Sequence, residues 1–135
     1  MPRKSITCGG CGMVSIPSKG STGKYCSVKC QQNKALRDRA SKWLGGKASF
    51  SNRALNRIIT LLRGYRCDVC GLSEWMSKPI TLEVEHRDGN SLNCAPENVC
   101  LICPNCHSQT PTYKARNKGN GRHYRRQRYA EGKSY

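Results

Sequence analysis

The most informative segment of the chain is LEVEHRDGNSLNCAPENVCLICPNCHSQT, which runs from Leu82 to Thr110. It contains His86, Asn98, His107 and the cysteine pair Cys103-x2-Cys106. Imidazole and thiolate groups bind metals, and imidazole also transfers protons near neutral pH. The sequence therefore predicts that the chemistry of this chain lies in this stretch.

A strand is predicted at the start of this stretch. Ile80, Leu82 and Val84 alternate with polar residues, which is the pattern of a half-buried strand that ends at His86. The sequence Asp88-Gly89-Asn90 follows and favours a turn or loop.

The second half of the stretch predicts another strand and a helix. A short strand is expected over residues 98–102. Pro104 suits the first position of a helix, so residues 105–109 are expected to be helical, and Pro111 ends them. The predicted order is strand, loop, strand and helix, with a histidine at two of the junctions.

The ten cysteines include two sets with the spacing of zinc-binding knuckles. The first set is Cys8-x2-Cys11 with Cys26-x3-Cys30, and the second is Cys67-x2-Cys70 with Cys103-x2-Cys106. Four thiolates bind zinc tetrahedrally at about 2.3 Å. Disulfides or free thiols are the alternative, which the looser spacing of the first set leaves more open. Cys94 lies in a polar loop, where no partner is expected.

Length and composition predict a small fold that depends on metal. The chain has 135 residues, of which 36% are hydrophobic, and a single phenylalanine, so it can build only a poor apolar core. Each structural zinc contributes folding free energy directly, on the order of 10 kcal/mol in zinc-finger peptides. We therefore expect an α+β fold with little regular sheet that is stabilised by two zinc ions.

The charge of the chain predicts a polyanionic partner. The formal net charge is +16 with only eight acidic residues, and the excess of lysine and arginine along the chain favours nucleic acid over a membrane surface. No apolar run is long enough to span a bilayer, and the N-terminus lacks the apolar segment of a signal peptide. We expect a cytoplasmic protein whose thiols stay reduced.

Changes in composition divide the chain into four predicted parts. Residues 1–30 form an N-terminal zinc knuckle, and residues 31–64 form a helical region. Residues 65–113 hold the second cysteine set and the stretch quoted above, and residues 114–135 form a basic tail.

Two helices are expected in the helical region. The first covers Gln31–Leu44 and stops at Gly45-Gly46, and the second begins after Ser51 as its N-cap and ends at Gly64. Its expected apolar face consists of Leu55, Ile58, Ile59 and Leu62. This face is expected to pack in the core.

These motifs resemble the HNH endonuclease family in its ββα-metal form, and its small phage-type members in particular. The resemblance covers about residues 66–117, and the string ENVCLICPNCHSQT is similar to the second half of the family motif. Members commonly carry an N-terminal cysteine knuckle as well. The resemblance implies an enzyme that hydrolyses DNA phosphodiester bonds with one divalent cation.

The resemblance also implies roles for single residues. His86 stands at the position of the general base that activates water, and His107 at the position of a metal ligand. Asn98 matches the family asparagine, which implies either a metal contact or a hydrogen bond that fixes the catalytic loop. Glu85 stands where the family usually has aspartate or histidine as another ligand, and Asp88 is the alternative oxygen donor.

These roles agree with the chemistry of phosphodiester hydrolysis. Histidine is the side chain whose ordinary pKa lies nearest neutrality, so it can accept a proton from water. A cation bound by carboxylate and imidazole stabilises charge on the phosphate. Such mixed ligands suit Mg²⁺, Mn²⁺ or a transition metal, and do not distinguish among them.

The basic tail is the first candidate for DNA binding. Its expected contacts are Lys114, Arg116, Lys118, Arg122, Arg125, Arg126 and Arg128, interleaved with tyrosines. A solvated tail without a binding role is the alternative.

Other classes of protein remain open at this point. A non-catalytic zinc module that binds nucleic acid explains the charge and the cysteines, but not His86, Asn98 and His107 together. The resemblance to phage proteins implies the host cell cytoplasm and a homing-type, replication or packaging role. A packaging partner and a homodimer are compatible with the same residues.

Overall fold

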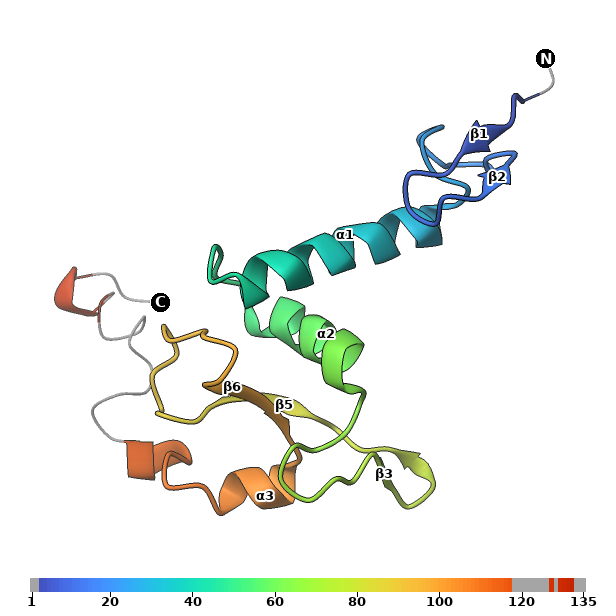
Figure 1. Cartoon of the computed structure of the whole chain (residues 1–135). Helices are drawn as coiled ribbons and strands as arrows, with labels where there is room; N and C mark the ends of the chain where they lie inside the picture. The colour runs from blue at the N-terminus through green and yellow to red at the C-terminus, as the bar shows by residue number, and fades with distance from the viewer. Residues whose placement is uncertain (1–2, 118–126, 128, 133–135) are drawn as a thin grey trace. The chain divides into compact units, whose positions relative to one another are not determined.

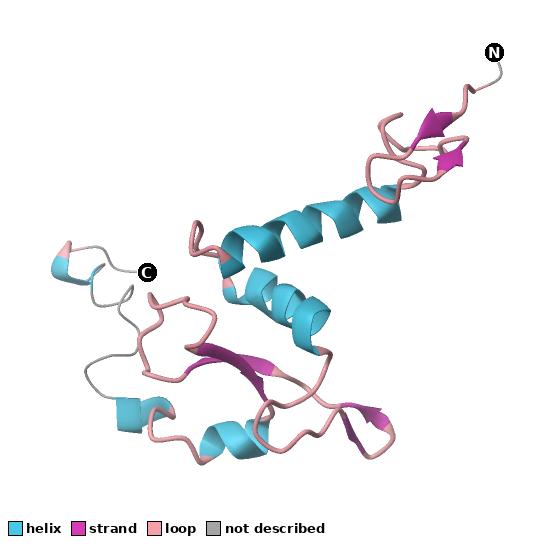
Figure 2. Ribbon diagram, in the orientation of Figure 1, coloured by secondary structure: helices cyan, strands magenta, loops and turns pink. Residues whose placement is uncertain are grey.

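A computed structural model describes residues 3–117, 127 and 129–132. The chain consists of two compact units, Met1–Lys42 and Trp43–Tyr135, each of which is described by itself. Short strands and helices are joined by many loops, and the described residues contain three sheets of two strands each (Figures 1 and 2). The predicted α+β class with little regular sheet is confirmed. The finer division into four parts stays a prediction.

The first unit contains a small hairpin and most of a long helix. Strands β1 (Ile6–Thr7) and β2 (Val14–Ser15) pair antiparallel, and helix α1 covers Val28–Leu44. The helix ends where the sequence predicts but begins three residues before Gln31. The reason is Ser27, whose hydroxyl accepts a hydrogen bond from the backbone N–H of Cys30 and thus caps the helix.

Helix α2 (Asn52–Arg63) forms the core of the second unit together with strands β5 and β6. Ser51 caps it as predicted, by accepting a hydrogen bond from the N–H of Ala54, and the N–H of Gly64 closes its other end on the carbonyl of Thr60. Leu55, Ile58 and Ile59 are fully buried, as expected. The prediction for Leu62 is wrong, because this side chain is 42% exposed.

The segment Leu82–Thr110 folds as strand, loop, strand and helix. Strand β5 (Glu83–His86) pairs antiparallel with β6 (Val99–Ile102), with Glu85 opposite Cys100 and His86 opposite Val99. All of β6 is buried, and α2 contacts both strands. Helix α3 (Pro104–Ser108) follows directly, with its proline in the first turn. A 3-10 helix, η1, covers Lys114–Asn117.

One hairpin of the second unit was not expected from the sequence. Strands β3 (Glu74–Trp75) and β4 (Lys78–Pro79) are joined by Met76 and Ser77, which both have positive φ angles of 51° and 61°. Positive φ at both central residues is the geometry of a tight hairpin turn, which usually contains asparagine or glycine. The residue types at this turn therefore gave no signal for it.

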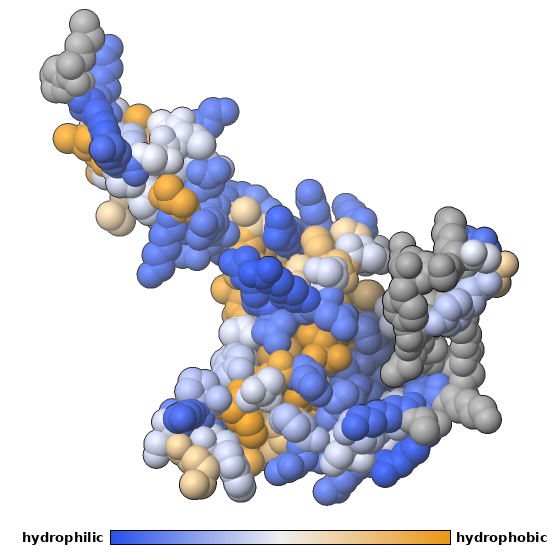
Figure 3. Space-filling model, turned by 180° about the vertical axis from the view of Figure 1, so that it is seen from behind, coloured by the Kyte–Doolittle hydropathy of each residue, from blue (hydrophilic) through white to orange (hydrophobic). Residues whose placement is uncertain are grey.

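The surface agrees with the composition. On the face drawn in Figure 3, hydrophilic residues are widespread and hydrophobic ones form scattered patches between them. Among the described residues, none of the helices is both long and apolar enough to cross a membrane.

The two sides of α2 give a test of the core. Ile58→Ala removes a fully buried side chain, and we expect it to lower the free energy of unfolding by about 2–5 kcal/mol. Leu62→Ala on the exposed side of the same helix is the control and should change it by less than about 1 kcal/mol. Thermal or denaturant unfolding measures both. Equal losses from the two substitutions would contradict the packing described here.

Candidate active site

Two groups of four cysteines have the geometry of tetrahedral zinc sites. In each group, all four sulfur atoms lie within 4.8 Å of one another. The first group is Cys8, Cys11, Cys26 and Cys30, and the second is Cys67, Cys70, Cys103 and Cys106. The Sγ–Sγ distance is 3.5 Å for Cys8 and Cys30, and 3.8 Å for Cys70 and Cys103. Four sulfurs at about 2.3 Å from one zinc lie about 3.8 Å apart. Both groups could therefore hold zinc as predicted.

Backbone N–H groups prepare one thiol of each tetrad for ionisation. The N–H groups of Cys26, Cys11 and Gly10 lower the pKa of Cys8 to about 5. Burial opposes ionisation of Cys67, but N–H groups of Cys70 and Cys103 outweigh it and lower the pKa of that thiol to about 6. N–H donors stabilise a thiolate, which is the form that binds zinc.

One further thiol in each tetrad resists ionisation in the absence of a cation. The pKa of Cys30 is raised to about 12. The hydrogen bond with Cys8 is the largest cause, and burial is the second. The pKa of Cys106 is also raised to about 12. Burial is the largest cause, and hydrogen bonds with the neighbouring thiols are the next. A divalent cation removes this penalty, because it pairs with all four negative charges.

The second tetrad joins the segment before β3 to the start of α3. Cys103 is the N-cap residue of α3, and its N–H donates to Cys67 Sγ at 3.4 Å. Beside it, the carboxylate of Asp68 accepts a hydrogen bond from the N–H of Leu101, and the N–H of Asp68 donates to the carbonyl of Leu101. These bonds fix the position from which α3 presents His107.

His107 lies between two carboxylates of strand β5. Its Nδ1 atom is 2.5 Å from Glu83 Oε2, and its Nε2 atom is 2.9 Å from Glu85 Oε2. The hydroxyl of Thr112 donates to the other oxygen of Glu85. Glu85 is buried, with 8% of its surface exposed. The Glu85 carboxylate and the His107 imidazole therefore offer an oxygen and a nitrogen ligand, 2.9 Å apart, to a cation.

The distance between Glu85 and His107 suits two ligands of one metal ion. Adjacent ligands of an octahedral ion at about 2.1 Å lie about 3.0 Å apart, close to the observed 2.9 Å. Glu83 then orients the ring through Nδ1, which is the usual role of a carboxylate behind a metal-bound histidine. Outside the two cysteine tetrads, Glu85 and His107 could thus offer two adjacent ligands to one divalent cation.

Asn98 organises the loop between the two strands. Its Nδ2 group donates to Asp88 Oδ1 at 2.9 Å and to the carbonyl of Asn93 at 2.7 Å, while its Oδ1 accepts from the N–H of Asp88. Asp88 also accepts from the side chain of Asn93 and the N–H of Asn90. These donors, the Asn93 amide first, lower the pKa of Asp88.

His86 lies at the end of β5, where it is 8% exposed. Desolvation lowers its pKa, and the nearby carboxylates of Glu85 and Asp88 oppose this shift only in part. The imidazole is therefore neutral at pH 7 and can accept a proton. Its Nε2 atom lies 3.8 Å from Cys94 Sγ, so the prediction that Cys94 has no partner is wrong.

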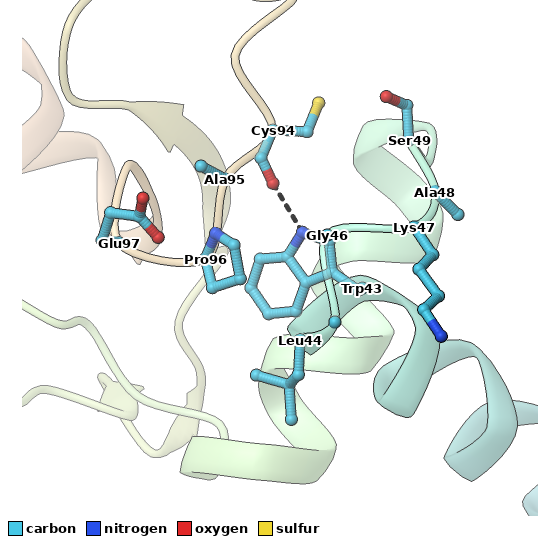
Figure 4. A pocket seen from close by; sticks show the side chains of 11 residues that line it. Trp43, Leu44, Gly46, Lys47, Ala48, Ser49, Cys94, Ala95, Pro96 and Glu97 are labelled. Carbon is cyan, nitrogen blue, oxygen red and sulfur yellow. Dashed lines mark hydrogen bonds between the residues drawn. The ribbon is translucent and has the colours of Figure 1, made fainter.

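Trp43 fixes the backbone of Cys94 from the other side. Its indole N–H donates to the carbonyl of Cys94 at 2.6 Å, and Figure 4 shows the thiol pointing away from the indole. The ring also lines a pocket between residues 43–49 and 94–97. The loop that carries Cys94 beside His86 is therefore held at a defined place.

Four contributors to this site were missed from the sequence: Glu83, Cys94, Thr112 and Trp43. Glu83 had a signal, because it stands two residues before Glu85 in a strand and so shares its face. The other three come from outside β5, β6 and α3, and their contacts depend on tertiary packing.

Only part of the basic tail can be described. Lys114 Nζ lies 4.9 Å from the ring centroid of Tyr113, and Arg116 donates to the carbonyls of Ser108 and Thr110. Arg116 thereby supports the chain that follows α3. The other predicted contacts, Lys118, Arg122, Arg125, Arg126 and Arg128, lie outside the described residues.

Strands β5 and β6 followed by helix α3, beside a cysteine tetrad, have the ββα order predicted from the sequence. The chain is similar to the H-N-H endonuclease F-TflIV of Escherichia phage T5, at 44% identity over 75 residues. The match covers 55% of this chain and 33% of that relative, so the chain spans about a third of the relative's length. No family model and no solved structure matches. The predicted resemblance to HNH endonucleases is confirmed.

The tetrads give a test by zinc content. We expect the purified chain to bind two zinc ions, and Cys103→Ser to lose one of them and to unfold at lower temperature. Cys100→Ala, which changes a buried cysteine outside both tetrads, should keep two. Elemental analysis and thermal unfolding measure these quantities. A chain whose unfolding temperature is unchanged by chelation would contradict the zinc sites.

Gly89 gives a test of the loop. Its φ is +72°, and a Cβ atom there would lie 2.2 Å from Asn117 Oδ1, while Asn117 donates to the carbonyl of Gly89. Gly46→Ala, at a φ of +66° in open space, should cost about 1–2 kcal/mol of stability for the backbone conformation alone. Gly89→Ala should cost more, because Asn117 must also move. Equal unfolding temperatures for the two variants would argue against this close contact.

Proposed function

We propose that this protein is a metal-dependent HNH endonuclease that hydrolyses phosphodiester bonds of DNA. The observation that carries the proposal is the position of His107 between Glu83 and Glu85, on the same ββα unit as the buried His86. The name of the phage relative supports the same activity. The net charge of +16 supports a DNA substrate.

His86 is the general base of the proposed reaction. Its neutral imidazole takes a proton from a water molecule, whose oxygen bonds to phosphorus as the scissile P–O bond breaks. The departing sugar oxygen takes a proton from solvent. Desolvation favours the neutral imidazole and so keeps it available as a base at pH 7. Because Cys94 Sγ contacts Nε2, Nδ1 is the nitrogen that we assign as the proton acceptor.

Glu85 and His107 hold the proposed divalent cation, which is Mg²⁺, Mn²⁺ or a transition metal. When bound, this ion supplies positive charge to the phosphate oxygens. Asn98 and Asp88 are both engaged within the loop, which favours a positioning role for them over direct metal contact. Asn98 thereby holds the loop that follows His86.

The biological setting follows from the same proposal. We propose a homing-type, replication or packaging nuclease that acts in the host cytoplasm, a setting compatible with the phage source of the relative. One ββα site cuts one strand, so a double-strand break requires a homodimer or a second encounter. Lys114 and the tail beyond it are proposed DNA contacts, and a packaging partner is compatible with these roles.

The first experiment compares wild type with His86→Ala on supercoiled plasmid in Mg²⁺ or Mn²⁺. We expect relaxed or linear product from wild type and a loss of at least about 100-fold in the variant, because the base is removed. Zinc content and unfolding temperature are measured on the same samples. Thr81→Ala, at an exposed position next to β5, is the matched control and should cleave normally.

Two outcomes would contradict the proposal. Cleavage retained by His86→Ala would show that this histidine is not the base. DNA binding by zinc-loaded wild type without cleavage in any divalent metal would favour a non-catalytic zinc module that binds nucleic acid.

A further inference from the structure

A second cationic feature lies beside the candidate active site. A hollow of about 550 Å³ opens between the first half of α2 and strand β5, and His107 forms part of its wall. Helix α2 contributes Arg53 and Arg57, together with Asn52 and Asn56. This groove belongs entirely to the second unit.

The two arginines of the groove have no acidic partner among the described residues. Both side chains are exposed, and neither forms an ion pair or hydrogen bond with any part of the chain that the structure describes. They stand four residues apart on one helix face, where like charges repel and destabilise a helix by about 0.2–0.5 kcal/mol. Such a pair is favourable once an anion lies between or beside the two guanidinium groups.

The helix that carries these arginines is fixed in place. Leu55, Ile58 and Ile59 are fully buried beneath it, and Asn56 Nδ2 donates to the carbonyl of Leu82 at 3.1 Å. Because Asn56 lies between the two arginines in sequence, this bond holds their part of α2 against the segment that enters β5. The arginines are therefore presented at a constant position relative to His107.

The chemistry of the groove favours phosphate as its ligand. Arginine guanidinium groups bind phosphate oxygens in a bidentate manner. The start of α2 adds the partial positive charge of a helix N-terminus, although Ser51 already caps the N–H of Ala54 there. The one carboxylate in the groove, Glu83, is engaged by His107 Nδ1 and does not pair with either arginine.

We propose that Arg53 and Arg57 bind backbone phosphates of the DNA strand next to the scissile bond. This inference rests on the proposed nuclease function, because it assigns the groove to the same substrate. The contacts are to phosphates, so they position the strand over His107 and His86 without selecting a base sequence. The two arginines are positioning residues and take no part in the chemical step.

Binding of a duplex oligonucleotide at several salt concentrations tests the proposal. The full zinc-loaded chain with His86→Ala is used, so that no DNA is cut during the measurement. Arg53→Gln with Arg57→Gln should weaken binding at least about 10-fold at low salt. The slope of log affinity against log salt should become less steep by about 1.8, because each phosphate contact contributes about 0.9.

The matched control removes two positive charges outside the groove. Arg66→Gln with Lys78→Gln changes exposed residues of the same unit, and it should leave affinity and slope nearly unchanged. If both double variants weaken binding equally, the effect is one of net charge and the groove proposal is overturned. The proposal is also overturned if the Arg53 and Arg57 variant binds with the affinity and slope of its parent.

Cleavage by the same double variants, with His86 intact, separates this proposal from the nuclease proposal. The groove variant should raise KM while kcat changes little, because it loses strand binding but keeps the base and metal ligands. A fall in kcat with an unchanged KM in the groove variant would overturn the positioning role. If wild type does not cleave at all, the nuclease proposal fails, while the oligonucleotide measurement still decides whether the groove binds DNA.

Discussion

The arrangement of the second unit depends on the tetrad of Cys67, Cys70, Cys103 and Cys106. Two of these thiols come from a turn before β3 and two from the junction of β6 and α3. The apolar core beneath them is small, so a zinc ion that joined these segments would add folding free energy directly. His107 follows Cys106 directly in α3, so a zinc ion bound by the tetrad would also hold His107 in place.

The two histidines of the candidate site are held in place by different contacts. His107 is held by the tetrad on one side and by two carboxylates of β5 on the other. His86 is held by the end of β5 and by a loop that Asn98 organises from within. Because each side chain has its own anchor, the site is set before any substrate arrives, and preorganisation of this kind favours catalysis by positioning.

Much of this arrangement could be predicted from the sequence, because it depends on local signals. The cap at Ser51, the proline before α3 and the alternation that leads to His86 each act over a few residues, and each lies where expected. The cysteine spacings likewise predicted both tetrads. The contact of Cys94 with His86 and the exposure of Leu62 could not be predicted, since they depend on how distant segments pack. The β3–β4 turn escaped notice because its residues are atypical for that geometry.

The hydrogen bond from Trp43 to the carbonyl of Cys94 has a practical consequence. The chain contains two tryptophans, of which Trp75 is 59% exposed and Trp43 only 1%. The emission of a buried indole differs from that of one in water, so the two signals are separable in principle by their wavelengths. Replacement of Trp75 by phenylalanine leaves Trp43 as the single tryptophan, hydrogen-bonded to the loop beside His86. Movement of that loop on binding of metal or DNA can then be followed in solution without an added label.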